Sequence, residues 1–83
     1  MTLSFKYSDS LLTIQCRGND TLNSVFNRYC VKAGFQQKNP VFYFNGKRIV
    51  GDDKNKTIVE YGIPNMGVFE VVLTDYVIGA KIN

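Results

Sequence analysis

With 83 residues, the chain is long enough for one domain, and a hydrophobic content of 45% can supply a single core without metals or disulfides. The net charge is +3, and no block of five or six like charges occurs, which excludes a polybasic arm for nucleic acid. The chain contains no histidine, which excludes Ser-His and Cys-His nucleophile pairs and histidine-containing zinc sites.

The sequence contains neither a membrane-spanning segment nor a secretory signal, and it has two cysteines. The longest apolar runs are far shorter than the roughly 20 residues that cross a bilayer, and the first residues lack the regions of a secretory signal. We therefore expect a cytoplasmic or nuclear protein. Cys16 falls at an inward position of a predicted strand and Cys30 on the apolar side of a predicted helix. We interpret both as packed thiols, with a disulfide or a reactive thiol as the alternative.

The first segment has the alternating pattern of a β-hairpin. Hydrophobic residues alternate with polar ones in two runs, at Leu3, Phe5 and Tyr7 and then at Leu12, Ile14 and Cys16. Residues 8–10, Ser-Asp-Ser, supply the turn between them. We expect a hairpin with one apolar face, which needs a second layer to cover it.

A helix is predicted to follow and to provide that layer. Its apolar residues recur at i, i+3, i+4, i+7, i+8 and i+11, at Leu22, Val25, Phe26, Tyr29, Cys30 and Ala33. Asp20 or Thr21 can cap the first turn, and Gly34 suits the left-handed residue that ends the helix.

Two more strands and a connector complete the pattern. Pro40 introduces an extended segment that ends at Asn45-Gly46, a dipeptide suited to positive φ. After the polar tract 51–56, residues 57–63 form a turn-rich connector with three candidate core side chains, Ile58, Tyr61 and Ile63. In the last strand, Phe69, Val71 and Leu73 alternate with Val68, Glu70 and Val72.

The order of elements predicts an α+β domain over residues 1–74, with a C-terminal tail at 75–83. We expect a ββαββ arrangement in which a mixed, four- to five-stranded sheet packs on one main helix.

Three segments in this order resemble SUMO and the wider ubiquitin-like family. The helix at 22–34 resembles the SUMO helix, in which a Tyr-Cys pair precedes a glycine by the same interval. Residues 42–49 are similar to its Phe-x-Phe-x-Gly-x-x-Ile strand and turn, and residues 67–71 to its closing strand. The resemblance implies the β-grasp fold, whose members act mostly by being bound by other proteins.

The resemblance implies two candidate binding surfaces. One is the ubiquitin-type sheet face, with Tyr43 matching the central apolar residue of the recognition patch, Val72 its neighbour and Glu70 a position held by histidine in ubiquitin. Val41, Lys47 and Arg48 are expected to form its rim, and Val68 adds to an apolar outer face. The alternative is that Tyr43 is only a strand-favouring residue on a solvated face.

The second surface is the SUMO-type groove, which accepts a hydrophobic peptide as an added strand between the second strand and the helix. Its expected wall consists of Thr13, Gln15 and Arg17, with Ile14, Cys16, Val25 and Tyr29 beneath or beside it and Lys32 near its end. Only Arg17 and Lys32 are basic here, while Gln15 and Ser24 occupy positions that are basic in the family. Recognition of acidic motifs therefore does not follow from the resemblance.

Conjugation to other proteins would require a suitable C-terminus. The chain has no Gly-Gly, but Gly79 stands at about the right distance past the last strand for a single-glycine modifier such as the ubiquitin-fold modifier. Removal of residues 80–83 would expose it. A glycine in a tail is also an ordinary linker residue.

No enzyme or cofactor is predicted. The acidic residues are scattered, their only adjacent pair being Asp52-Asp53, and residues 62–67 lack the lysine and helix of a phosphate loop. Our leading hypothesis is a monomeric, non-covalent protein-interaction module bound by ubiquitin-fold receptors, ligases or parts of its own parent chain, without membrane contact. The alternatives are a covalent modifier processed at Gly79 and a weak nucleic-acid binder that uses Lys47 and Arg48 beside aromatic residues.

Overall fold

The computed structural model describes residues 1–74 and begins with the predicted hairpin. Strand β1 (Thr2–Tyr7) pairs antiparallel with β2 (Ser10–Gln15), so that Leu3 lies opposite Ile14 and Phe5 opposite Leu12. Ser8 adopts a positive φ of 53° in the turn between the strands. Because side chains alternate along a strand, these four apolar residues share the face that the helix covers.

Helix α1 (Leu22–Ala33) has both of its predicted ends. The Thr21 side chain accepts a hydrogen bond from the Ser24 backbone N–H, so Thr21, and not Asp20, is the N-cap. Gly34 ends the helix with a φ of 80°, a left-handed conformation that favours glycine, and its N–H reaches back to the carbonyls of Cys30 and Val31.

The second hairpin contains a tight two-residue turn. Strand β3 (Pro40–Phe44) pairs antiparallel with the short strand β4 (Lys47–Arg48). Asn45 and Gly46, between the strands, both have positive φ, at 53° and 79°. This conformation matches a hairpin turn of type I′ and confirms the reading of the Asn-Gly dipeptide.

The segment between β4 and the last strand is more ordered than the predicted connector. Residues Gly51–Asn55 form the 3₁₀ helix η1, and Ile58–Tyr61 form the short helix α2. Thr57 and Glu60 cap α2 reciprocally, the Thr57 side chain bonding the Glu60 N–H and the Glu60 carboxylate accepting from the Thr57 N–H. The expectation of a turn-rich loop was therefore wrong for this single helical turn.

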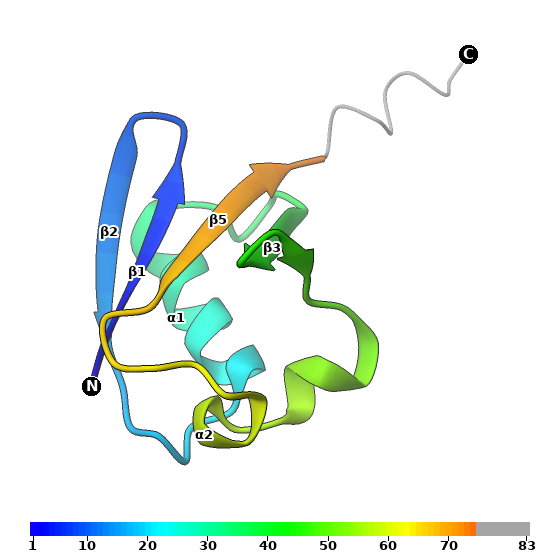
Figure 1. Ribbon diagram of the computed structural model, residues 1–83. Helices are drawn as coiled ribbons and strands as arrows, with labels where there is room; N and C mark the ends of the chain where they lie inside the picture. The colour runs from blue at the N-terminus through cyan, green and yellow to red at the C-terminus, as the bar shows by residue number, and fades with distance from the viewer. Residues whose placement is uncertain (75–83) are drawn as a thin grey trace.

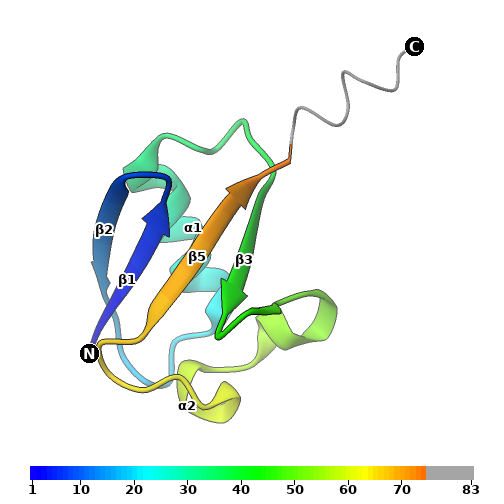
Figure 2. The ribbon, with the colours of Figure 1, turned by 45° about the horizontal axis from the view of Figure 1, so that its top comes forward.

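Strand β5 (Val68–Leu73) joins the two hairpins at the centre of the sheet. It runs parallel to β1 and antiparallel to β3, which gives the order β2-β1-β5-β3-β4. Figures 1 and 2 show the strands β1, β2, β3 and β5 on one side and α1 packed across their other side. The mixed five-stranded sheet on one main helix is compatible with the ubiquitin-like β-grasp that the sequence predicts.

The core between sheet and helix is rich in aromatic rings. Phe5 stacks on Tyr29 with centroids 4.5 Å apart, and Phe26 stacks on Phe42 at 3.9 Å. Phe69 of the central strand also stacks on Phe5, at 5.0 Å. Ile58 and Ile63 are buried as predicted, whereas Tyr61 is half-buried.

Candidate functional site

A continuous row of side chains crosses the outer face of the sheet. Strand register places neighbouring residues side by side across all five strands, in the order Leu11, Lys6, Glu70, Tyr43 and Arg48. Directly paired residues share a face, and this is the face turned away from α1. Four of the five side chains are exposed and Tyr43 is half-buried, so the row forms surface. Tyr43 is thus flanked by a carboxylate on one side and a guanidinium on the other.

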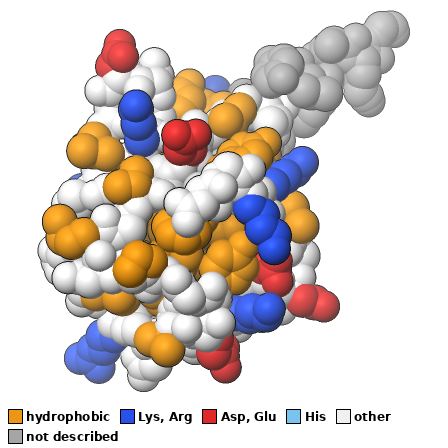
Figure 3. Space-filling model, viewed as in Figure 1, with side chains coloured by type: hydrophobic (Ala, Val, Ile, Leu, Met, Phe, Trp, Pro, Cys, Tyr) orange, Lys and Arg blue, Asp and Glu red, His pale blue; other side chains and the backbone are white. Residues whose placement is uncertain are grey.

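Exposed valines lie on either side of this row. Val68 retains 47% and Val72 retains 46% of its accessible surface. Val41 pairs with Val72 but retains only 9%, so this predicted rim residue contributes little surface. Figure 3 shows hydrophobic side chains interleaved with basic and acidic ones on the face viewed.

The charged side chains of the row form no ion pairs among the described residues. Among residues 1–74, neither Lys6, Glu70 nor Arg48 forms an ion pair, and the two described pairs involve Arg28 with Asp20 and Lys56 with Asp53. Lys47, the remaining predicted rim residue, is exposed on β4 but pairs with Phe44, so it lies on the opposite face of the sheet from Tyr43 and does not join the row. We call the row together with Val68 and Val72 the outer-face patch.

The edge of β2 that faces away from β1 differs from the outer-face patch, because side chains of α1 already bond to it. Met1 and Cys16 exchange two backbone hydrogen bonds. Because hydrogen-bonded and non-hydrogen-bonded pairs alternate along an antiparallel ladder, the carbonyls of Thr13 and Gln15 point away from β1. Lys32 donates from Nζ to the Thr13 carbonyl at 2.9 Å, and Arg28 donates to the Gln15 carbonyl at 3.0 Å. Both carbonyls that an added strand would use thus accept a bond from the helix.

The predicted groove residues beneath this edge are core residues. Ile14, Cys16, Val25 and Tyr29 are all buried, so they support the edge without presenting side chains to a peptide. Burial raises the pKa of the Cys16 thiol and that of the Cys30 thiol, which keeps both protonated at neutral pH and makes them weak nucleophiles. Both cysteines are free, as the reading of packed thiols predicts.

Asp20 anchors the end of the β2 edge. Its carboxylate accepts hydrogen bonds from the Arg17 backbone N–H at 2.9 Å and from the Arg28 guanidinium at 2.8 Å. These two bonds, the Arg17 one first, hold the pKa of Asp20 below its ordinary value. Arg17, a residue of the predicted groove wall, is exposed beside this cluster.

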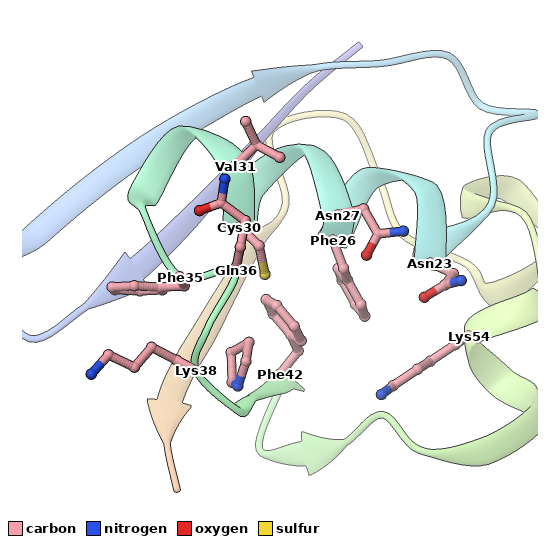
Figure 4. A pocket seen from close by; sticks show the side chains of 11 residues that line it. Asn23, Phe26, Asn27, Cys30, Val31, Phe35, Gln36, Lys38, Phe42 and Lys54 are labelled. Carbon is pink, nitrogen blue, oxygen red and sulfur yellow. The ribbon is translucent and has the colours of Figure 1, made fainter. Parts of the chain in front are cut away.

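A pocket that the sequence reasoning missed lies on the opposite flank of α1, between the helix, β3 and η1 (Figure 4). Its volume is about 440 Å³, and it is lined by Asn23, Phe26, Asn27, Cys30, Val31, Phe35, Gln36, Lys38, Pro40, Phe42 and Lys54. The lining comes from four separate segments, so no local pattern in the sequence predicts the pocket.

Gly79 lies outside the described residues, so processing there stays a prediction. Within residues 1–74, no group of three or more acidic or cysteine side chains is placed to hold a metal ion, and no helix is long and apolar enough to span a membrane.

No curated protein matches the chain. A family model described as "Ubiquitin-2 like Rad60 SUMO-like" matches residues 2–73, almost all of the described fold. Domains of this kind are generally non-enzymatic and mediate protein interactions. The chain therefore belongs to this family of SUMO-like, ubiquitin-like domains.

Proposed function

We propose that the domain is a non-covalent interaction module, and that a partner protein binds it through the outer-face patch. The observation that carries the proposal is the row Leu11–Lys6–Glu70–Tyr43–Arg48, in which one aliphatic and one aromatic side chain lie beside three charged side chains that have no ion-pair partner among residues 1–74.

The chemistry of the patch suits a protein partner of mixed character. Tyrosine gives a large contact area at a small entropic cost, and interface hot spots are enriched in it. A charged side chain on each side of Tyr43 can fix the orientation of a partner that carries opposite charges. We therefore expect a partner that offers an apolar contact flanked by a basic group for Glu70 and an acidic group for Arg48.

The β2 edge is the weaker candidate. An added strand would have to displace the hydrogen bonds from Arg28 and Lys32, whose donors would then need new acceptors. The outer-face patch requires no such rearrangement.

A site-specific crosslinking experiment tests the proposal. A photoreactive amino acid is placed at Val68, beside the patch, or at Thr13, on the β2 edge, in the chain expressed in its own cells. We expect adducts from position 68, and we expect Tyr43→Ala in the same chain to abolish them. With the crosslinked protein purified, Tyr43→Ala should weaken binding by about 2 kcal/mol. Adducts from position 13 alone, insensitive to Tyr43→Ala, would overturn the proposal.

A further inference from the structure

The pocket between α1, β3 and η1 is separate from the outer-face patch. It opens on the helix side of the sheet, whereas the patch lies on the other side. It also lies on the flank of α1 opposite the β2 edge. Any ligand in it therefore leaves both other surfaces accessible.

The floor of the pocket is aromatic. Phe26 and Phe42 stack nearly parallel, with an interplanar angle of 11°, and both are almost completely buried. Cys30 and Phe35 are partly buried beside them, and Val31 on the rim keeps 63% of its surface. An apolar side chain entering here would remove the exposed surface of Val31 and the remaining surface of Cys30 and Phe35 from water, which is favourable.

A lysine ammonium points into the same pocket. Lys54 comes from η1, is half-buried, and extends over the opening in Figure 4. It has no hydrogen-bond or ion-pair partner among residues 1–74; its neighbour Asp53 is paired with Lys56 at 3.4 Å. A partly desolvated cation without a counter-charge favours an incoming anion.

The remaining lining adds hydrogen-bonding groups and no negative charge. Lys38 stands at the other end of the pocket, and Asn23, Asn27 and Gln36 contribute exposed amides. None of the lining residues is acidic. The pocket therefore combines an apolar floor, a cationic end and amides that can pair with a peptide backbone.

We propose that this pocket binds a short acidic peptide segment of a partner protein. One apolar side chain of the peptide packs against Cys30, Val31 and Phe35 above the Phe26–Phe42 stack, and a neighbouring carboxylate pairs with Lys54. The peptide backbone bonds the amide side chains along α1. The domain would then hold two partners at once, one at the patch and one at the pocket.

A peptide suits the pocket better than a nucleic acid. Sequence-tolerant binding of single strands needs exposed aromatic faces and a basic track along the backbone. Here the rings are 3% exposed and stacked on each other.

The test is a selection from a random octapeptide phage library on the full chain, followed by affinity measurements with the selected peptides. We expect enrichment of peptides in which Asp or Glu lies within a few residues of an aromatic residue or leucine. Lys54→Glu should weaken these peptides about tenfold or more, because a charge-assisted contact becomes a repulsion. Lys56→Glu makes the same charge change next to Asp53 and should have an effect below about twofold. Backbone amide signals of Asn27, Cys30 and Val31 should shift on binding.

Each other outcome overturns the proposal. A selection without acidic, Lys54-dependent peptides would do so. Peptides lost with Lys6→Glu but kept with Lys54→Glu would bind the outer-face patch, which leaves the proposed function standing and the pocket without a role. A mixed oligonucleotide that competes at the pocket would make the ligand a nucleic acid. If the combined substitutions Tyr76→Ser, Val77→Ser and Ile78→Ser shift the pocket signals without peptide, the chain's own tail is the occupant.

Discussion

The two flanks of α1 use basic side chains in opposite ways. On the β2 flank, Arg28 and Lys32 bond the strand carbonyls and Asp20, so their charges are used to hold the helix against the sheet. On the β3 flank, Lys54 lies over an aromatic floor with no partner among the described residues. A cation that satisfies a strand edge closes that edge to ligands, whereas one left over an apolar floor makes a site for an anion.

The largest expected effect concerns the floor of the β3 flank. Phe42→Ala removes a ring that is buried and stacked on Phe26, and should lower the free energy of unfolding by about 3–5 kcal/mol. Tyr43→Ala, one residue along β3 on the outer face, should cost about 1 kcal/mol or less. Urea denaturation of both variants measures the difference. Equal losses would show that Tyr43 supports the core and is not available to a partner.

The next largest loss of stability is expected on the β2 flank. Arg28→Met keeps the apolar stem but loses the bonds to the Gln15 carbonyl and to Asp20, and should cost about 1–2 kcal/mol. The matched control is Arg48→Met, on β4, where the guanidinium has no ion pair among the described residues and the loss should stay within about 0.5 kcal/mol.

Two lysine substitutions, one on each flank of α1, differ in whether the ammonium has a partner. Lys32→Met should cost about 0.5–1 kcal/mol, because the Thr13 carbonyl loses its donor. Lys54→Met removes a half-buried cation that lacks a counter-charge and should change stability by less than about 0.5 kcal/mol in either direction. Thermal or urea unfolding of the two variants measures both changes in stability. A larger loss for Lys54→Met would mean that its ammonium is already satisfied inside the domain.

The sequence predicts most of the fold because its signals are local. Alternation predicts the strands, the i, i+3, i+4 pattern predicts α1, and Thr21, Gly34 and Asn45-Gly46 mark the points where the chain must turn or stop. The sequence reasoning missed η1 and α2, because five and four residues are too few to display a helical period.

The sites are predicted less completely, because they depend on contacts between distant segments. Nothing in the spacing of Arg28 and Lys32 reveals that they bond the carbonyls of β2, 13 and 19 residues earlier. The β3-flank pocket combines residues of α1, the loop after it, β3 and η1, and no motif links Lys54 to Phe42. Tyr43 and Val72 were identified because strand alternation and the family resemblance agree on which side chains face outward.

The smallest expected effect is a pH dependence confined to the β2 flank. The folded pKa of Asp20 is lowered by hydrogen bonds from the Arg17 N–H and from Arg28, so the folded state favours the carboxylate. The stabilisation is therefore fully present above the usual Asp pKa of 3.8 and is lost as the pH falls through the lower folded value.

Asp20→Asn should destabilise the domain at pH 6, and this difference from the original chain should shrink towards pH 2.5. The denaturation midpoints of the two proteins at several pH values measure it. Because the Asp20 side chain is only half-buried, the difference should be small and should decrease with added salt. A difference that is independent of pH would assign the role of Asp20 to the shape of its side chain, and the β2 flank would then rest on the carbonyl bonds of Arg28 and Lys32 alone.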